Sequence, residues 1–192
     1  AEFGLAGGAE SMSRAPYTLP AARWGQKMGA AGGVDMMVGA LTCPFGNGHM
    51  GVTAENVAAE HQITREEQDA FALESQSRVA AAQQAGHFDS QIVPVEVKVK
   101  REMVEFKTDE HPKATTLEKL AGLKTVFKRD GTVTAGNASG INDGAAAIVL
   151  ATADAAEREG RRPKARSLGY ALDGEGADEL GFGKINTLGS LL

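Results

Sequence analysis

The chain has 192 residues, a formal net charge of −5 and a single cysteine. Hydrophobic residues make up 42% and charged residues 23%, which is the balance of a folded globular protein rather than of a disordered or fibrous chain. No apolar run approaches the roughly 20 residues that span a bilayer, and the acidic balance argues against nucleic-acid binding. One cysteine excludes an internal disulfide and favours a reducing compartment.

The first part of the chain combines an apolar segment with a long irregular stretch. Residues 2–8 predict the end of a short buried strand that runs into a glycine turn. Because the chain begins inside a strand and residues 184–192 carry no polar tail, we expect a piece of a longer protein. Residues 11–51 are rich in Gly, Pro and Met, which fits a functional surface and a plain surface excursion equally well.

Two helices are expected next. The first is short and runs from Ala54 to about His61. The second has clear boundaries, because Thr64 can cap it and Glu67, three residues later, completes a capping box. Gly86 can adopt the left-handed conformation that ends such a helix.

Residues 92–100 alternate apolar and polar side chains, with four valines on one face, which predicts a half-buried strand. Pro94 cannot donate a ladder hydrogen bond, so an edge position is expected. Between Lys98 and Arg129 nine basic residues stand against five acidic ones, a local charge of +4. This basic segment is either a solvated face or an anion site for a phosphate-bearing ligand.

The stretch from residue 131 to 152 opens with a glycine-rich turn and continues as a small-residue apolar run. The length of the run favours a fully buried strand over a buried helix. A helix over residues 153–159, closed by Gly160, and a strand over residues 165–171 are expected to follow. Strand, helix and strand in this order predict a βαβ unit and a parallel sheet covered by helices.

The glycine-rich turn itself has two interpretations. It lacks the spacing of a phosphate loop and of a dinucleotide-binding fingerprint. Its backbone N–H groups and the Ser139 hydroxyl could pair with a ligand amide, because glycine lets the backbone come close. The alternative is tight packing of one segment against another.

Few single residues point to chemistry. Cys43 lies in a loop with no capping pattern behind it, so a buried or neutral thiol is favoured over a nucleophile. The four histidines show no helical metal-binding spacing, and no metal site is expected. His49, in a Gly-rich loop, could donate a hydrogen bond to a ligand, whereas Asp143 has no paired carboxylate for acid/base work.

Four blocks of sequence, in this order and spacing, resemble the thiolase family: residues 6–17 (AGGAESMSRAPY), 49–58 (HMGVTAENVA), 68–76 (QDAFALESQ) and 131–147 (GTVTAGNASGINDGAAA). The resemblance covers nearly all of residues 3–171, and the His-Met-Gly form of the second block is most like the acetyl-CoA acetyltransferase branch. It weakens after Gly183, where LGFGK at residues 180–184 stands in place of a Met-Gly-x-Gly-Pro block.

The resemblance implies an α/β, thiolase-like fold of which this chain holds a part. It implies four regions: the end of the first α/β/α half (1–11), an inserted loop domain for CoA binding and oligomerisation (12–141), a return to the first half (142–161), and the start of the second half with a divergent tail (162–192).

The resemblance also implies acyl transfer between acyl-CoA thioesters, with CoA thioesters as substrates and no covalently bound cofactor. In the family a cysteine carries the acyl group, a histidine activates it, a second cysteine acts as acid/base, and two oxyanion holes stabilise the charged intermediates. None of these catalytic residues is matched within the chain, and Cys43 falls at neither cysteine position. The isolated chain is therefore expected to bind CoA weakly without turnover.

The complete protein is expected to be a cytoplasmic homodimer or homotetramer that binds neither nucleic acid nor membrane. The alternative is a truncated, non-catalytic thiolase-like module for CoA binding or assembly.

The CoA-contacting positions implied by the resemblance fall into three groups. His49 and Met50 are expected beside the reacting thioester, and Lys113 near the CoA nucleotide. The pantetheine channel is expected to be lined by Leu41, Phe127, Ala135, Ser139, Gly140 and Ile141. The phosphates of CoA then give the basic segment a role, which favours the anion site over the solvated face.

Overall fold

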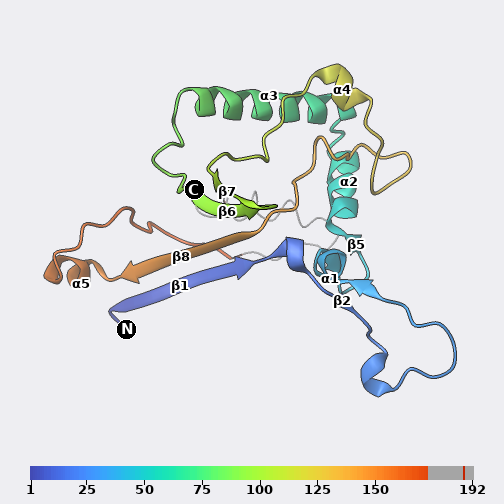
Figure 1. The fold of residues 1–192 in the computed structure, drawn as a ribbon, viewed down its shortest axis with the longest axis horizontal. Coiled ribbons are helices and arrows are strands. Elements are labelled where there is room, and N and C mark those ends of the chain that lie inside the picture. The colour runs from blue at the N-terminus through green and yellow to red at the C-terminus, as the bar shows by residue number, and fades with distance from the viewer. Residues whose placement is uncertain (173–187, 189–192) are drawn as a thin grey trace. The chain divides into compact units, whose positions relative to one another are not determined.

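The computed structural model describes residues 1–172 and 188 (Figure 1). The expected divergence at residues 180–184 lies outside these described residues. The chain is a mixed α/β protein that forms two compact units. The first unit comprises Ala1–Ala54 with the described part of Ile141–Leu192, and the second is Glu55–Gly140.

A long two-stranded sheet dominates the first unit. Strands β1 (Phe3–Glu10) and β8 (Gly144–Ala151) pair antiparallel along their whole length, and both are visible as long arrows in Figure 1. Strand β8 lies where the sequence predicts it, and β1 begins where a strand is predicted. The predicted glycine turn is wrong, because β1 runs through Gly7 and Gly8 to Glu10. The predicted burial is wrong, because every residue of both strands is exposed. Two paired strands form a single layer, which leaves side chains on both of its faces exposed.

Helix α5 (Ala153–Arg158) follows β8 as predicted, with Thr152 as its N-cap and Gly160 at a φ of 60° beyond its end. The predicted strand over residues 165–171 is wrong, since this segment is irregular and leaves the side chains of Leu168 and Tyr170 90% and 85% exposed. A strand needs a neighbour for its backbone groups, and this segment has none in the described chain. The predicted parallel βαβ unit is therefore wrong too, and all four described sheets are antiparallel pairs.

The glycine- and proline-rich stretch after β1 holds only short elements, as its lack of periodicity predicts. In order they are η1 (Met12–Arg14), β2 (Tyr17–Thr18), η2 (Ala22–Trp24), β3 (Val34–Asp35), α1 (Met36–Ala40), β4 (Thr42–Cys43) and β5 (Gly48–His49). Strand β2 pairs with β3 and β4 pairs with β5.

Asp143 ties this stretch to the start of β8. Its carboxylate accepts hydrogen bonds from the Ser13 hydroxyl at 2.6 Å, the Ser13 N–H at 2.9 Å and the Ser11 hydroxyl at 3.3 Å. These bonds, chiefly the one from the Ser13 hydroxyl, hold the pKa of Asp143 below its usual range. The carboxylate is thus an ionised anchor between two segments far apart in the sequence.

We expect Ser13→Ala to raise the pKa of Asp143 toward the ordinary carboxyl value, because the largest of the lowering contacts is removed. A depressed native pKa gives stability that is fully present above the ordinary pKa and is lost as the pH falls through the native value. An NMR titration of the Asp143 carboxyl measures the change, with the exposed Ser90→Ala as control. Equal pKa values in wild type and Ser13→Ala would refute this assignment.

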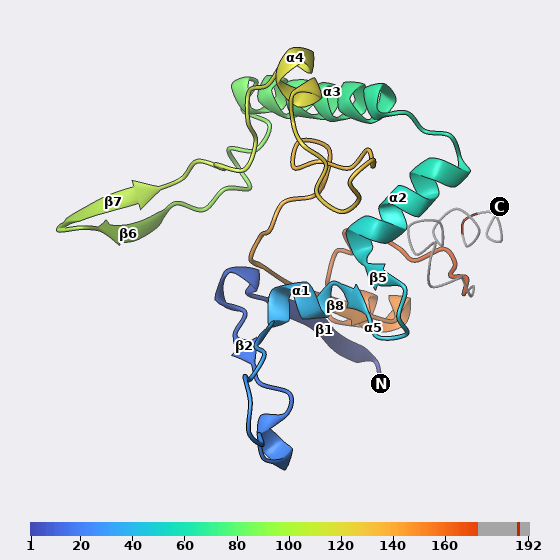
Figure 2. The ribbon, with the colours of Figure 1, turned by 90° about the vertical axis from the view of Figure 1, so that its right-hand side faces the viewer.

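The second unit is built around helix α3 (Arg65–Gln84), which packs against α4 (Leu117–Ala121) (Figure 2). The predicted capping box is confirmed: the Thr64 hydroxyl accepts from the Glu67 N–H at 3.2 Å, and the Glu67 carboxylate accepts from the Thr64 N–H at 2.8 Å. Gly86 has a φ of 71°, as the predicted helix end requires.

Strands β6 (Val95–Val99) and β7 (Glu102–Phe106) form an antiparallel hairpin, drawn as a ribbon of its own in Figure 2. The predicted strand is confirmed over a shorter range that begins after Pro94. The predicted half-burial is wrong except at Val97, because the hairpin has no covering layer among the described residues. Strand β7 was not predicted, since its charged residues hide the alternation.

The interior of the second unit contains charged and polar side chains as well as apolar ones. Leu120 and Val133 are buried, but so are Glu55 at 4%, Asp69 at 3% and Thr134 at 0% exposure. Buried carboxylates are stable only when they are hydrogen-bonded or paired, so these side chains mark contacts that hold the unit together. In the described part of the chain, no helix combines the length and the apolarity that crossing a membrane requires.

Candidate functional site

Three of the predicted CoA-contacting residues meet in the β4–β5 hairpin of the first unit. Thr42 pairs with His49 across the hairpin, and the Met50 N–H donates to the Leu41 carbonyl at 2.8 Å. All three predicted residues, Leu41, His49 and Met50, are half-buried. The hairpin therefore brings Leu41 beside the His-Met pair, as a shared ligand contact would require.

His49 caps helix α2 (Met50–Glu60). The histidine was expected in a loop and the helix from Ala54, but His49 ends β5 and the helix begins at the next residue. The reason is that the His49 Nδ1 accepts the Gly51 N–H at 3.0 Å, a capping contact that sequence patterns of Ser, Thr, Asp or Asn do not reveal. The Nδ1 atom of His49 is thereby engaged at the start of the helix, which fixes the orientation of the ring.

Cys43 occupies the same hairpin. Its thiol is half-buried and accepts the Phe45 N–H at 3.4 Å. The backbone N–H groups of Asn47 and then of Phe45 hold the pKa of Cys43 below the ordinary thiol value. Within residues 1–172 and 188, no group of three or more His, Cys, Asp or Glu side chains is placed to hold a metal ion.

In the second unit, the glycine-rich turn forms an ordered loop over residues 131–140, here called the glycine loop. Glu55 of α2 holds its first part: the Glu55 carboxylate accepts the Thr132 N–H at 2.8 Å and the Val133 N–H at 2.9 Å. It also accepts the Thr132 hydroxyl at 3.1 Å, and that hydroxyl accepts from the Gln68 amide at 2.8 Å. The start of the loop is therefore fixed by side chains of both α2 and α3.

Asn137 fixes the middle of the glycine loop. Its side-chain oxygen accepts the Thr134 N–H at 2.8 Å, and its side-chain amide donates to the Thr132 carbonyl at 3.1 Å and to the Asp69 carboxylate at 3.0 Å. Arg65 in turn pairs with Asp69 at 2.7 Å and donates to the Leu120 carbonyl at 2.6 Å. A chain of polar contacts thus runs from α4 through α3 into the loop.

The two interpretations of the glycine-rich turn apply to different positions. At Gly136 the packing interpretation is confirmed, because a Cβ there would lie 2.5 Å from the Leu120 side chain and 2.6 Å from that of Leu123. A Cβ at Gly140 would collide with the His111 ring. Ala135 and Ser139, by contrast, are exposed. Their contact with a ligand stays a prediction.

The other predicted positions are also placed by local contacts. Phe127 is half-buried, in a segment that the Thr125–Thr134 bridge and the Val126 N–H to Val133 carbonyl bond join to the glycine loop. Lys113 is exposed, and its N–H donates to the Gln76 side chain of α3 at 2.9 Å. Ile141 begins the return to the first unit and is 57% exposed.

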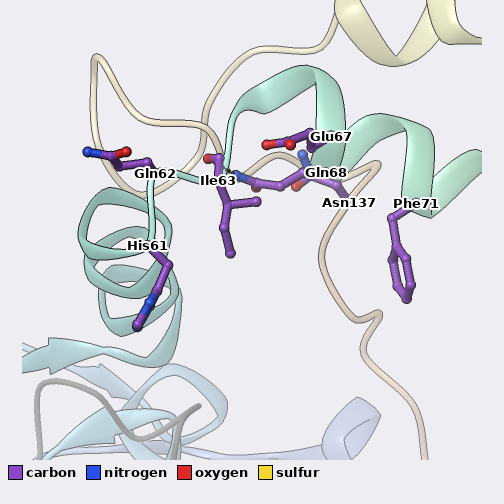
Figure 3. A pocket seen from close by; sticks show the side chains of 7 residues that line it. All are labelled: His61, Gln62, Ile63, Glu67, Gln68, Phe71 and Asn137. Atoms are coloured by element: carbon purple, nitrogen blue, oxygen red, sulfur yellow. Dashed lines mark hydrogen bonds between the residues drawn. The ribbon is translucent and has the colours of Figure 1, made fainter.

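Two shallow hollows occur in the second unit, and neither is the predicted site. The first has a volume of about 460 Å³, and Figure 3 shows its side chains: His61, Gln62, Ile63, Glu67, Gln68, Phe71 and Asn137. The second is lined by residues of α2 and of the start of the glycine loop. None of the nine predicted CoA-contacting residues lines either hollow.

Comparison with known proteins identifies the family. Residues 1–154 match the family model described as thiolase, N-terminal domain. The chain belongs to the thiolase family. The resemblance of the four sequence blocks to thiolases is thereby confirmed.

This thiolase chain is similar to several characterised proteins. It is 53% identical over 186 residues to the beta-ketothiolase BktB of Cupriavidus necator, an alignment that covers 96% of this chain and 47% of that protein. The acetyl-CoA acetyltransferase structure from Bacillus anthracis matches 99% of this chain and 48% of its own with a TM-score of 0.89 at 44% identity. The structure of human mitochondrial 3-ketoacyl-CoA thiolase in complex with CoA matches 99% of this chain and 48% of its own with a TM-score of 0.87 at 43% identity. The thiolase chain thus spans about half the length of the relatives it matches.

The residues that hold the glycine loop were not predicted from the sequence. Glu55, Asp69 and Asn137 lie inside the blocks that carry the thiolase resemblance, yet each looks like an ordinary polar residue there. The available signal was weak: Glu55 lies among small and apolar residues of the TAENVAA run, where a solvated carboxylate is not expected.

Proposed function

We propose that this thiolase chain binds CoA thioesters and takes part in acyl transfer between them. The observation that carries the proposal is the glycine loop: its frame is fixed by buried contacts, while Ala135 and Ser139 remain exposed on it. A fixed backbone with one exposed hydroxyl suits the amide-bearing pantetheine arm of CoA. The fold similarity to a structure described as a CoA complex supports the same ligand.

In this proposal each predicted residue has a physical task. Ser139 exchanges a hydrogen bond with a pantetheine amide, the small residues Ala135 and Gly140 let the arm lie close to the backbone, and Ile141 supplies apolar contact. Leu41 and Phe127 supply apolar contact. His49 donates a hydrogen bond beside the thioester, with Met50 adjacent, and a donor at that position suits a carbonyl oxygen on which negative charge develops.

The charge distribution supports the proposed contact with the nucleotide end of CoA. Residues 98–129 carry a net charge of +4 in a chain whose total is −5, so a phosphate-bearing ligand would be drawn to this segment. Lys113 lies within it and is exposed. We propose that this lysine faces the CoA phosphates.

The nucleophile of the acyl-transfer step is not assigned to a residue of this chain. Cys43 is half-buried in a backbone hairpin and matches neither family cysteine, so this chain contributes binding rather than the nucleophile. We further propose that the complete protein is a cytoplasmic homodimer or homotetramer. Exposed apolar side chains on the stretch after β1, such as Trp24 at 86% and Tyr17 at 75%, support self-association.

We expect Ser139→Ala to raise the dissociation constant for CoA about fivefold, which corresponds to about 1 kcal/mol, the net contribution of one hydrogen bond. Isothermal titration calorimetry with CoA measures this dissociation constant in the full-length protein that the gene encodes. Ser75→Ala, an exposed serine on α3, is the control and should leave the affinity unchanged. An affinity unaltered by Ser139→Ala would remove this hydroxyl from the site, and a wild-type protein without CoA affinity would refute the proposed function.

A further inference from the structure

Two buried carboxylates hold the glycine loop. Glu55 is 4% exposed on α2, and Asp69 is 3% exposed on α3. Both residues point toward a loop of neutral residues, and neither has a role in the proposed ligand contacts. Burying a carboxylate costs free energy unless its oxygens accept hydrogen bonds. The donors that reach Glu55 and Asp69 therefore indicate the role of each carboxylate.

Glu55 uses both carboxylate oxygens on the loop backbone. Oε1 accepts the N–H groups of Thr132 at 3.0 Å and Val133 at 2.9 Å, and Oε2 accepts the Thr132 N–H at 2.8 Å and hydroxyl at 3.1 Å. A carboxylate has two oxygens, and both accept hydrogen bonds. It therefore suits a place where several donors converge, which a neutral amide with one accepting oxygen cannot satisfy. Charge-assisted bonds of this kind fix the backbone direction two residues before Ala135.

Asp69 acts on the same loop through Asn137. One Asp69 oxygen accepts from the Asn137 amide at 3.0 Å and the other from Arg65 at 2.7 Å. These donors fix which way the Asn137 amide points, and its oxygen is thereby aimed at the Thr134 N–H, 2.8 Å away. Asn137 lies two residues before Ser139, so the loop is held on both sides of Ala135.

We propose that Glu55 and Asp69 are positioning residues for the CoA-binding segment, residues 135–140, an inference that rests on the proposed function. They do not touch the ligand. They hold the exposed hydroxyl of Ser139 and the neighbouring backbone in the geometry that binds, so that CoA does not have to order the loop. Their removal therefore weakens binding through the loss of that preordered geometry.

The test compares conservative and disruptive variants in the protein as its gene encodes it. Glu55→Gln keeps one acceptor oxygen and replaces the other with a donor, and Glu55→Ala removes both. We expect the dissociation constant for CoA to rise about fivefold in Glu55→Gln and by more in Glu55→Ala. Asp69→Asn, which places an amide donor against Arg65 or Asn137, should raise it to a similar extent. Glu60→Gln on α2 and Glu66→Gln on α3, both exposed carboxylates, are the matched controls and should bind CoA as wild type does.

Coupling to Ser139 separates positioning from a general loss of stability. If Glu55 acts through the loop, then Ser139→Ala should weaken binding less in the Glu55→Gln background than in wild type, so that the two effects do not multiply. Two results would overturn the positioning role while leaving the proposed function intact. The first is that the effects of the two substitutions on the dissociation constant multiply. The second is that Glu55→Gln binds CoA as wild type does, although Ser139→Ala weakens binding. Loss of folding in both Glu55 variants would show a purely structural role. Absence of CoA binding by the wild type would end the proposed function and this inference together.

Discussion

Asp69→Ala is expected to lower the free energy of unfolding of the second unit by about 3 kcal/mol, because removing one partner leaves the other charge of a buried pair uncompensated. The Arg65–Asp69 contact is 2.7 Å long, and the two side chains are only 20% and 5% exposed. The change also takes away the acceptor that orients the Asn137 amide. Asp69→Ala therefore removes both the ion pair with Arg65 and the hydrogen bond from the Asn137 amide.

The chain supplies a matched control for this prediction. Glu74 and Arg78, also on α3 and also four residues apart, form an ion pair of the same 2.7 Å length, but their side chains are 57% and 79% exposed. Glu74→Ala should cost no more than about 0.5 kcal/mol, because water screens exposed pairs. Urea unfolding followed by far-UV circular dichroism measures both variants. Similar losses in the two would show that burial does not decide the strength of these pairs.

Sequence predicted the elements whose signals are local. The Thr64 capping box, the helix end at Gly86 and the end of α5 at Gly160 each depend on residues within one or two turns, and all three are confirmed. The start of α2 was missed because a histidine nitrogen, rather than a hydroxyl or carboxylate, caps it. Local rules therefore succeed where the capping chemistry is common.

Burial could not be predicted, because it depends on what covers an element. The apolar runs of β1 and β8 predict an interior position, and the register from Phe3↔Ala151 to Glu10↔Gly144 joins segments at opposite ends of the described chain. No neighbouring residues encode that pairing. The same holds for the hairpin of β6 and β7, whose apolar alternation indicates a covered face that the described residues do not supply.

The candidate site, like the fold, could be predicted from the sequence only in part. The family resemblance supplied the positions expected to touch CoA, and the structure brings Leu41 close to His49 and Met50 and leaves Ser139 exposed. The resemblance did not supply the residues behind the glycine loop. Glu55 reaches Thr132 across 77 residues of sequence, so only the folded chain reveals their contact.

Gly131→Ala is expected to destabilise the second unit by about 2 kcal/mol, the cost of leaving buried polar groups unsatisfied. An added Cβ would collide with the Glu55 carboxylate. That carboxylate cannot yield without giving up the N–H groups of Thr132 and Val133, which it accepts at 2.8 Å and 2.9 Å. The collision therefore costs hydrogen bonds rather than a simple side-chain rotation.

Gly122→Ala is the control, because a Cβ there lies 3.5 Å from the Glu118 carbonyl oxygen, an ordinary contact. Its φ of −76° suits alanine, so the change should be neutral or slightly stabilising. The decisive measurement repeats Gly131→Ala in a Glu55→Ala background. There the added methyl group meets no carboxylate, and its further cost should fall to within about 0.5 kcal/mol of zero. An undiminished cost would place the strain in the loop backbone and would show that Glu55 is not what requires glycine at this position.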